Sequence, residues 1–176
     1  MFAQIRRSGE MVVKLEGSTE FPLKAAEVWA ALHDVDILVR TIPGCKSMVP
    51  DRAGGSSDGN QSYIVSLSLG VASIKGDYEG RVTVNDLVYP THYTLSAEGA
   101  GSPGYVNMNI DCRLEAQNGG TLMQWTCDAE IGGLIASIGG RILTGISKYM
   151  AQQFFKALKA EMAGTPKYAA AAAVKG

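Results

Sequence analysis

Hydrophobic and polar positions alternate along much of the chain, as they do in β-strands that turn one face toward a core. The first alternating run begins at Met11 and ends at Pro22, after residues 1–10, which show no period. Alternation returns in six later segments, and we predict a strand in each. These segments are Ser47–Asp51, Gln61–Gly70, Ser73–Leu87, Thr91–Gly101, Tyr105–Gln117 and Thr121–Gly133.

The connections between these runs are short, and this decides how the strands pair. Asn118-Gly119-Gly120 separates the last two runs, and Asn-Gly between alternating segments is a strong hairpin signal. Strands joined by such short connections are antiparallel neighbours. The pattern therefore predicts one antiparallel sheet of about seven strands.

Three other segments place their apolar residues at helical spacing. Leu23–Asp34 has Val28, Trp29 and Leu32 at that spacing, and a second short helix is predicted over Val35–Thr41. The last predicted helix is much longer and runs from residue 134 to about residue 162. Its predicted apolar stripe consists of Ile135, Ile138, Ile142, Ile146, Tyr149, Met150, Phe154 and Leu158.

A sheet with one wet face needs a cover over its other face, and only the last helix is long enough to provide it. We therefore predict an α+β fold, in which a curved antiparallel sheet wraps around a long C-terminal helix. Glycines such as Gly76 and Gly80 would mark the bends of that sheet. The domain is predicted to span residues 11–163, between a flexible leader (1–10) and an Ala-rich tail (164–176).

A curved sheet that grips one helix leaves a cavity wherever the helix does not fill the curve. Apolar residues on the inward face would either form an ordinary filled core or line a pocket for an apolar ligand. The pattern leaves both interpretations open, and it also leaves open which face of each strand points inward. The predicted lining consists of Leu67, Leu69, Tyr78, Val82, Tyr93, Leu95, Tyr105, Met108, Ile110, Trp125, Ile138, Ile142 and Met150.

Composition and charge exclude several classes of function. The 176 residues suffice for one domain with a core, and the net charge of −1 provides no positive field for nucleic acid. The three cysteines are far apart and lack the spacing of a zinc site or a disulfide framework. No segment has the roughly 20 apolar residues of a membrane span, and the first residues do not resemble a secretory signal. We therefore expect a cytoplasmic protein that needs no metal or cofactor.

Few residues are placed to carry catalysis. Cys45 follows Pro43-Gly44, where a thiol is either a small buried hydrophobe or, if its pKa is lowered, a nucleophile. We interpret Cys45 as structural. We interpret His33 and His92 in the same way, because neither stands in a recognisable nucleophile arrangement.

The stretch “KLEGSTEFPLKAAEVWAALHDVDILVRTIPGCKSM” resembles the opening of the CoxG-like family of carbon monoxide dehydrogenase subunits. “VWAALHD” followed by “IPGCKSM” is its more specific part. “IKGDYEGRVTV”, “SAEGAGSPGYV”, “DAEIGGLIASIGGRIL” and “YMAQQFFKAL” continue in the family's order, so the resemblance covers about Val13 to Met162. It implies the helix-grip fold of the SRPBCC superfamily (START-like, birch-pollen-allergen-like), with a hydrophobic cavity and no built-in catalytic groups.

The resemblance also implies a ligand and a partner. CoxG-like proteins are linked to molybdenum hydroxylases such as carbon monoxide dehydrogenase, in recruitment, maturation or electron transfer to quinone. We therefore expect a carrier for a lipophilic molecule such as a quinone, with transient contact at the inner face of the cell membrane. Ile42, Pro43, Gly44 and Cys45 match the family's junction beside the cavity mouth, which would act as a hinge and lid.

Two other functions stay open at this point. One is an assembly factor that docks onto its partner while its interior is merely filled. The other is an enzyme of the same superfamily, which would need inward polar groups with perturbed pKa values. Tyr78, Tyr93, His92 or Glu98 would have to supply them.

Overall fold

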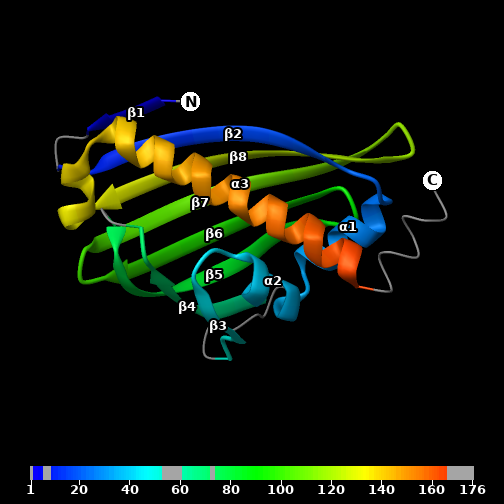
Figure 1. The fold of residues 1–176 in the computed structure, drawn as a ribbon, viewed down its shortest axis with the longest axis horizontal. Helices are drawn as coiled ribbons and strands as arrows, with labels where there is room; N and C mark the ends of the chain where they lie inside the picture. The colour runs from blue at the N-terminus through cyan, green and yellow to red at the C-terminus, as the bar shows by residue number, and fades with distance from the viewer. Residues whose placement is uncertain (1, 6–8, 53–60, 72–73, 166–176) are drawn as a thin grey trace.

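The computed structural model describes residues 2–5, 9–52, 61–71 and 74–165 (Figure 1). The α+β class is as predicted, and each strand predicted from Met11 onward is present with its ends within three residues. The strands are β1 (Phe2–Ile5), β2 (Met11–Phe21), β3 (Cys45–Pro50), β4 (Gln61–Leu69), β5 (Gly76–Val88), β6 (His92–Gly101), β7 (Gly104–Gln117) and β8 (Gly120–Gly132). The helices are α1 (Ala25–Leu32), α2 (Val35–Thr41), the 3₁₀ helix η2 (Gly133–Ile138) and α3 (Gly140–Gly164).

The strands form one antiparallel sheet in the order β1-β2-β8-β7-β6-β5-β4-β3. The described part of the chain contributes eight strands, one more than predicted. The additional strand is β1, which pairs with β2 and places Ala3 opposite Val13, where the sequence predicts a flexible leader. Residues 166–176, which make up most of the predicted tail, lie outside the described residues.

The prediction of a single helix over residues 134–162 is wrong at its start. The chain first forms η2, and α3 begins only after Gly139. Gly139 has a φ of 99°, a backbone conformation that other residues rarely adopt, so a continuous α-helix cannot run through it. On α3 it is Leu143 that enters the core, whereas Ile142 and Tyr149 of the predicted stripe are 52% and 53% exposed.

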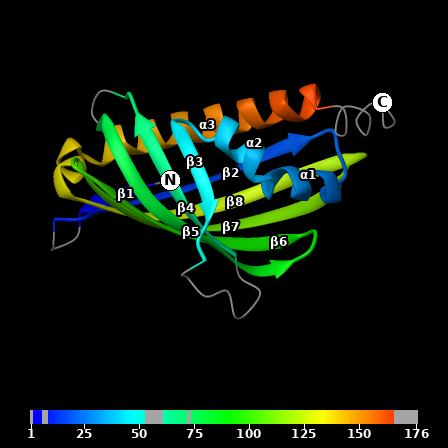
Figure 2. The same cartoon turned by 90° about the horizontal axis from the view of Figure 1, so that it is seen from below.

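Helix α3 crosses the sheet diagonally in Figure 1 and lies over its concave side in Figure 2. Within the described residues, its close backbone approaches to the sheet are to β2 and β1, and it also contacts α2. Arg40 of α2 donates to Glu161 of α3, with 2.6 Å between Nε and Oε1. The helix is therefore held along one edge of the sheet and against α2.

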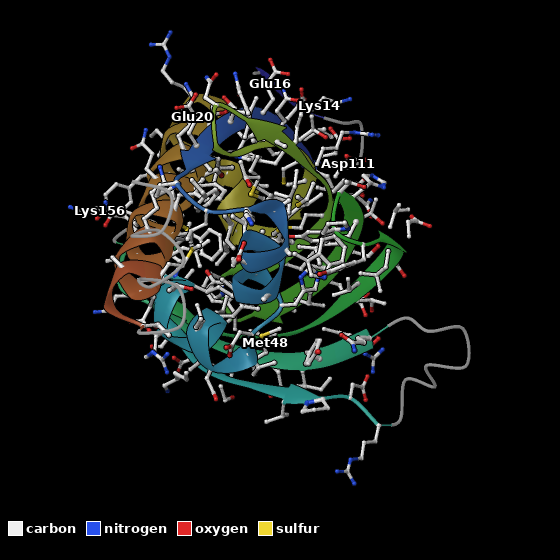
Figure 3. All side chains as sticks on the ribbon, turned by 90° about the vertical axis from the view of Figure 1, so that its right-hand side faces the viewer. Lys14, Glu16, Glu20, Met48, Asp111 and Lys156 are labelled. Atoms are coloured by element: carbon white, nitrogen blue, oxygen red, sulfur yellow. The ribbon has the colours of Figure 1, made fainter. Side chains whose placement is uncertain are left out.

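The two short helices close one end of the sheet. The carboxylate of Asp34 accepts hydrogen bonds from the backbone N–H groups of Asp36 and Ile37, at 3.0 and 3.3 Å, and so caps the start of α2. Figure 3, which looks at this end of the molecule, shows α1 lying across the end of the curved sheet. Val28 of α1 is fully buried there.

Buried side chains gather in two clusters between the sheet and α3. The cluster at the α1 end includes Val28 and Leu158, neither of which has any exposed surface. The cluster at the η2 end includes Val13, Ile135 and Leu143. Because burial of apolar surface is the main stabilising term in folding, these clusters hold the two ends of α3 onto the sheet.

Strands β5 and β6 approach each other very closely at glycines, which agrees with the predicted bends. A Cβ at Gly80 would collide with the carbonyl oxygen of Glu98, and a Cβ at Gly101 would collide with that of Asp77. Only glycine permits so close an approach. These positions help give the sheet its concave face.

Candidate ligand-binding site

Strand register decides which side chains face α3. Val82, Ala97, Met108 and Ala129 lie opposite one another in a row across β5, β6, β7 and β8. Ala129 belongs to the buried cluster at the η2 end, so the row points to the concave side. Alternation then assigns the inward residues of each of these strands.

The middle of the concave face keeps accessible surface although it faces the helix. Leu67, Leu95 and Met108 point inward, yet each is only half-buried. Val82 and Ala97, which are also half-buried, pack against neither buried cluster. These apolar side chains face the helix side of the sheet and yet are not fully covered.

The side of α3 that faces the sheet is also buried unevenly along its length. Its core face is fully buried at Leu143 and Leu158, near the two ends, but only half-buried at Ile146, Met150 and Phe154 between them. The stretch from Ile146 to Phe154 is about 12 Å long at 1.5 Å per residue. Accessible apolar surface on the helix therefore faces accessible apolar surface on the sheet. The cavity predicted between sheet and helix, the apolar space, would lie here, and it stays a prediction.

Trp125 of β8 stands at the border of this space and packs against both buried clusters. Its indole ring lies over Gly17 of β2, where an added Cβ would be only 2.6 Å from Cζ2. Phe155 of α3 stacks with it at 6.1 Å between ring centroids. These contacts make the ring a bridge between sheet and helix.

Most residues of the predicted lining do face inward. Tyr78 and Tyr93 are only 8% and 3% exposed and belong to the buried clusters, so they are part of the core rather than of the accessible wall. The predicted residues with an inward, half-buried side chain are Leu67, Leu69, Val82, Leu95, Met108, Ile110, Trp125, Ile138 and Met150.

Two predicted lining residues face outward, and their prediction is wrong. Tyr105 lies opposite Ala100 and Gly132 on the outer face and is 36% exposed, because the inward positions of β7 are Val106 and its alternates. Ile142 is exposed because the break before α3 changes which side of the helix meets the core. The pattern of apolar and polar residues does not show that Tyr105 faces outward, nor that Ile142 lies on the exposed side of α3.

The predicted cavity mouth, Ile42 to Cys45, is a tight turn that is bonded to β4. Gly44 has a φ of 76°, and its carbonyl oxygen accepts a hydrogen bond of 2.8 Å from the backbone N–H of Ser68. The backbone N–H of Cys45 donates to the carbonyl oxygen of Ile42 at 3.1 Å. The junction therefore ties α2 to the sheet, and a lid role for it stays a prediction.

Burial keeps the thiols protonated. It raises the pKa of Cys112 to about 12 and that of Cys127 to about 11. Burial also raises the pKa of Cys45. Since the thiolate is the nucleophile, the structural interpretation of Cys45 agrees with its surroundings. No three metal-ligating side chains come together in the described part of the chain.

A depression of 510 Å³ lies on the opposite, outer face of the sheet and is polar. Ser96 in its floor is hydrogen-bonded to Asn85 and Asn109, each at 3.3 Å. Figure 3 shows Asp111, another of its lining residues, on the outside of the molecule. This depression is therefore distinct from the apolar space on the concave side.

The helices of residues 2–5, 9–52, 61–71 and 74–165 can be compared with the length and apolarity of a membrane span. None of these helices combines the length and the apolar character needed to cross a bilayer.

Residues 17–163 match the CoxG family, which is described as a subunit of carbon monoxide dehydrogenase. The chain belongs to this family. A conserved protein from Geobacillus kaustophilus is 36% identical to the CoxG chain, with a TM-score of 0.79 over 86% of this chain and 96% of its own. No curated protein sequence matches the chain.

More distant structures share the fold of the CoxG chain. Ara h 8.0201 is 15% identical, with a TM-score of 0.65 over 88% of this chain and 99% of its own. A START superfamily protein from Mycobacterium smegmatis is 12% identical, with a TM-score of 0.59 over 84% and 95%. These likenesses confirm the predicted helix-grip fold. Membership of the CoxG family supports, at the level of the family, an accessory protein of the carbon monoxide dehydrogenase system.

Proposed function

We propose that the chain is a non-catalytic carrier that holds a lipophilic small molecule between the concave face of the sheet and α3. The observation that carries this proposal is the half-buried apolar belt between two fully buried clusters. A pocket of this kind, lined by apolar side chains with few polar groups, is the usual form of a small-molecule site. Met108 and Met150 suit a wall that must adapt to a flexible ligand.

The proposed partner is a molybdenum-containing dehydrogenase of the carbon monoxide dehydrogenase type, because the CoxG family takes its description from that enzyme. A quinone is the ligand that such a partner would favour, since it would link the enzyme to electron transfer at the membrane. The chain would then act in the cytoplasm and contact the membrane surface only transiently. Toward this partner the chain would serve in recruitment, in maturation or in electron transfer, and experiments must distinguish these three roles.

The apolar space is tested by filling it. Ala97→Trp places a large side chain between Val82 and Met108, on the concave face. Glu98→Trp is the matched control, because Glu98 is the next residue on β6 and its side chain, 67% exposed, points to the outer face. The measurement is the dissociation constant of a fluorescent apolar probe, anilinonaphthalene sulfonate, together with the melting temperature of each variant.

We expect Ala97→Trp to weaken probe binding roughly tenfold or more, which corresponds to about 1.4 kcal/mol. It should leave stability nearly unchanged, whereas a filled core would lose about 1–3 kcal/mol on overpacking. Glu98→Trp should change neither quantity. A large loss of stability in Ala97→Trp, or equal probe binding by the two variants, would show that the interior is packed and would overturn the carrier proposal.

The role toward the partner needs a second experiment. Purified carbon monoxide dehydrogenase is passed over immobilised wild-type chain and over the immobilised Ala97→Trp variant, and quinone reduction is then measured with each. A carrier predicts that both retain the enzyme but that only the wild type supports quinone reduction. Equal support by both would favour the assembly factor, and purified protein whose organic extract holds no lipophilic species by mass spectrometry would weigh against a resident ligand.

A further inference from the structure

Four aromatic rings meet at the α1 end of the interior. Trp29 of α1 and His33, the residue that follows this helix, stack with 4.5 Å between ring centroids. Tyr93 of β6 meets both edge-on, at 5.2 and 4.5 Å. Tyr89, in the turn between β5 and β6, meets Trp29 edge-on at 5.6 Å.

The hydrogen bond of His33 determines which ring nitrogen carries the proton. Nδ1 lies 2.8 Å from the carbonyl oxygen of Trp29, and a carbonyl oxygen can only accept, so Nδ1 is the donor. Burial lowers the pKa of His33, in spite of the opposite effect of this bond, and the ring is therefore neutral near pH 7. In that tautomer Nε2 carries a lone pair and is a hydrogen-bond acceptor.

That acceptor has no partner. Nε2 of His33 is buried, and no donor in the described part of the chain reaches it. A buried acceptor without a partner costs about 1–3 kcal/mol, and such atoms in folded proteins are usually satisfied by a water or a ligand. The fold thus contains a buried acceptor, Nε2 of His33, that lacks a hydrogen bond.

This acceptor lies at the α1 end of the interior. Trp29 and Tyr93, which flank His33, pack in the same cluster as Leu95 and Phe154, whose half-buried side chains border the space at this end. A molecule that lies between the sheet and α3 would have its end close to the aromatic group.

The surface beside this group is apolar and offers an opening. Leu87, Val88 and Tyr89 of the β5–β6 connection are 40%, 57% and 66% exposed. Because Nε2 of His33 has no accessible surface, a ligand would reach it only when Tyr89, two-thirds of which is exposed, turns away from Trp29. That rotation would uncover the stacked pair of Trp29 and His33.

We propose that Nε2 of His33 accepts a hydrogen bond from an O–H or N–H group of the molecule that occupies the apolar space. The inference rests on the proposed carrier function and adds the class of ligand. The ligand is an apolar molecule with a hydrogen-bond donor at one end, such as a phenol, a long-chain alcohol or the reduced quinol form of the proposed quinone. An ether or ester of the same shape, or the oxidised quinone, offers only acceptors and would not be selected. His33 is then the residue that selects the ligand.

Two probes that differ by one donor test this. 2-Naphthol and 2-methoxynaphthalene share the same ring system, but only the first has an O–H group. Their dissociation constants are measured with the wild type, His33→Leu and His33→Gln by titration calorimetry. The readout is the change in the ratio of the two constants between the wild type and each variant. The difference in hydrophobicity between the free probes is the same for every protein and cancels in this comparison.

We expect the preference for 2-naphthol to fall about 3–10-fold in His33→Leu, as the loss of one neutral hydrogen bond predicts. His33→Gln, whose side-chain oxygen is an acceptor near the position of Nε2, should keep part of the preference. His92→Leu is the control, since His92 bonds to Asp111 away from the space, at 3.1 Å, and should leave the ratio unchanged.

A measurement on the wild type avoids any variant that does not fold. The imidazole ¹⁵N resonance of Nε2 of His33 should shift with 2-naphthol and stay in place with 2-methoxynaphthalene. If both probes bind with a ratio that does not depend on position 33, and that resonance does not move, the inference about His33 is wrong while the carrier function stands. If neither probe binds, the carrier function itself fails.

Discussion

Gly17→Ala is the substitution that most directly tests the wall between the two clusters. The indole of Trp125 lies over Gly17, so that a Cβ at this position would be 2.6 Å from Cζ2 and 2.9 Å from Cε2. Carbon atoms in contact are normally about 3.5–4.0 Å apart. The ring would therefore have to move by about 1 Å, and it is held on its helix side by Phe155.

The expected loss of stability follows from two opposing terms. Overpacking in a well-packed site costs about 1–3 kcal/mol. Replacing glycine by alanine within a strand returns about 0.5–1 kcal/mol, because the unfolded chain loses freedom. With the midpoints of these ranges, about 2 and about 0.75 kcal/mol, the free energy of unfolding should fall by about 1.3 kcal/mol, which for a domain of this size lowers the melting temperature by about 3–5 °C.

The assay is urea and thermal unfolding of the wild type and two variants. Gly145→Ala is the matched control, because Gly145 lies in α3 and an added Cβ there meets nothing within 4 Å. It should stabilise the protein by about 1 kcal/mol through helix propensity alone. If Gly17→Ala proved as stable as the wild type or more so, the ring of Trp125 would not rest on β2, and the description of the wall would be wrong.

Other predictions separate the ends of the interior from its middle. Leu158→Ala, at a side chain with no exposed surface, should lose about 2–5 kcal/mol in urea unfolding, whereas Met150→Ala, half-buried beside the space, should lose less than half as much. Thr121→Val should lose about 1–3 kcal/mol by the same measurement, because it leaves the buried carbonyl oxygen of Leu23 without its 2.6 Å hydrogen bond. Burial lowers the pKa of His33 below its ordinary value near 6.5, so the unfolded chain binds that proton more tightly and stability should fall as the pH drops below about 6.5. His33→Leu should remove that part of the pH dependence, and an unchanged profile would contradict it.

The strands could be predicted because alternation and turn chemistry agree. From Met11 onward each predicted run is a strand, and the hairpin predicted at Asn118-Gly119-Gly120 joins β7 to β8. Asn118 and Gly119 both have positive φ, which is what a tight hairpin turn requires. Local sequence thus carries enough information for a sheet of sequential antiparallel strands.

Other features depend on information that alternation does not carry. The strand β1 has only four residues and gains its stability from pairing with β2, not from a pattern of its own. Gly139 is one of several glycines in a helical stretch, and only its φ of 99° identifies it as the break. The sequence predicts the wrong face for Tyr105 because the start of β7 fits either register.

The interior could be predicted as apolar but not as accessible. Leu95, which borders the space, and Leu158, which is fully buried, look alike in a sequence because both are leucines at inward positions. What separates them is the position of α3, which approaches the sheet along β1 and β2 and is fixed at α2 by Arg40. That position depends on contacts between residues far apart in the chain, such as Arg40 with Glu161.

The division between closed ends and an open middle has a consequence for how stability and binding respond to substitution. The fully buried clusters at the α1 and η2 ends supply much of the apolar burial, so they set the free energy of folding. The belt that includes Val82, Ala97 and Met150 keeps accessible surface and contributes less to that free energy. Substitutions in the belt should therefore change ligand affinity more than stability, and substitutions at the ends should do the reverse. In the proposed carrier, the side chains that would touch the ligand are not those that hold the helix on the sheet, so ligands of different shape could bind without loss of the structure.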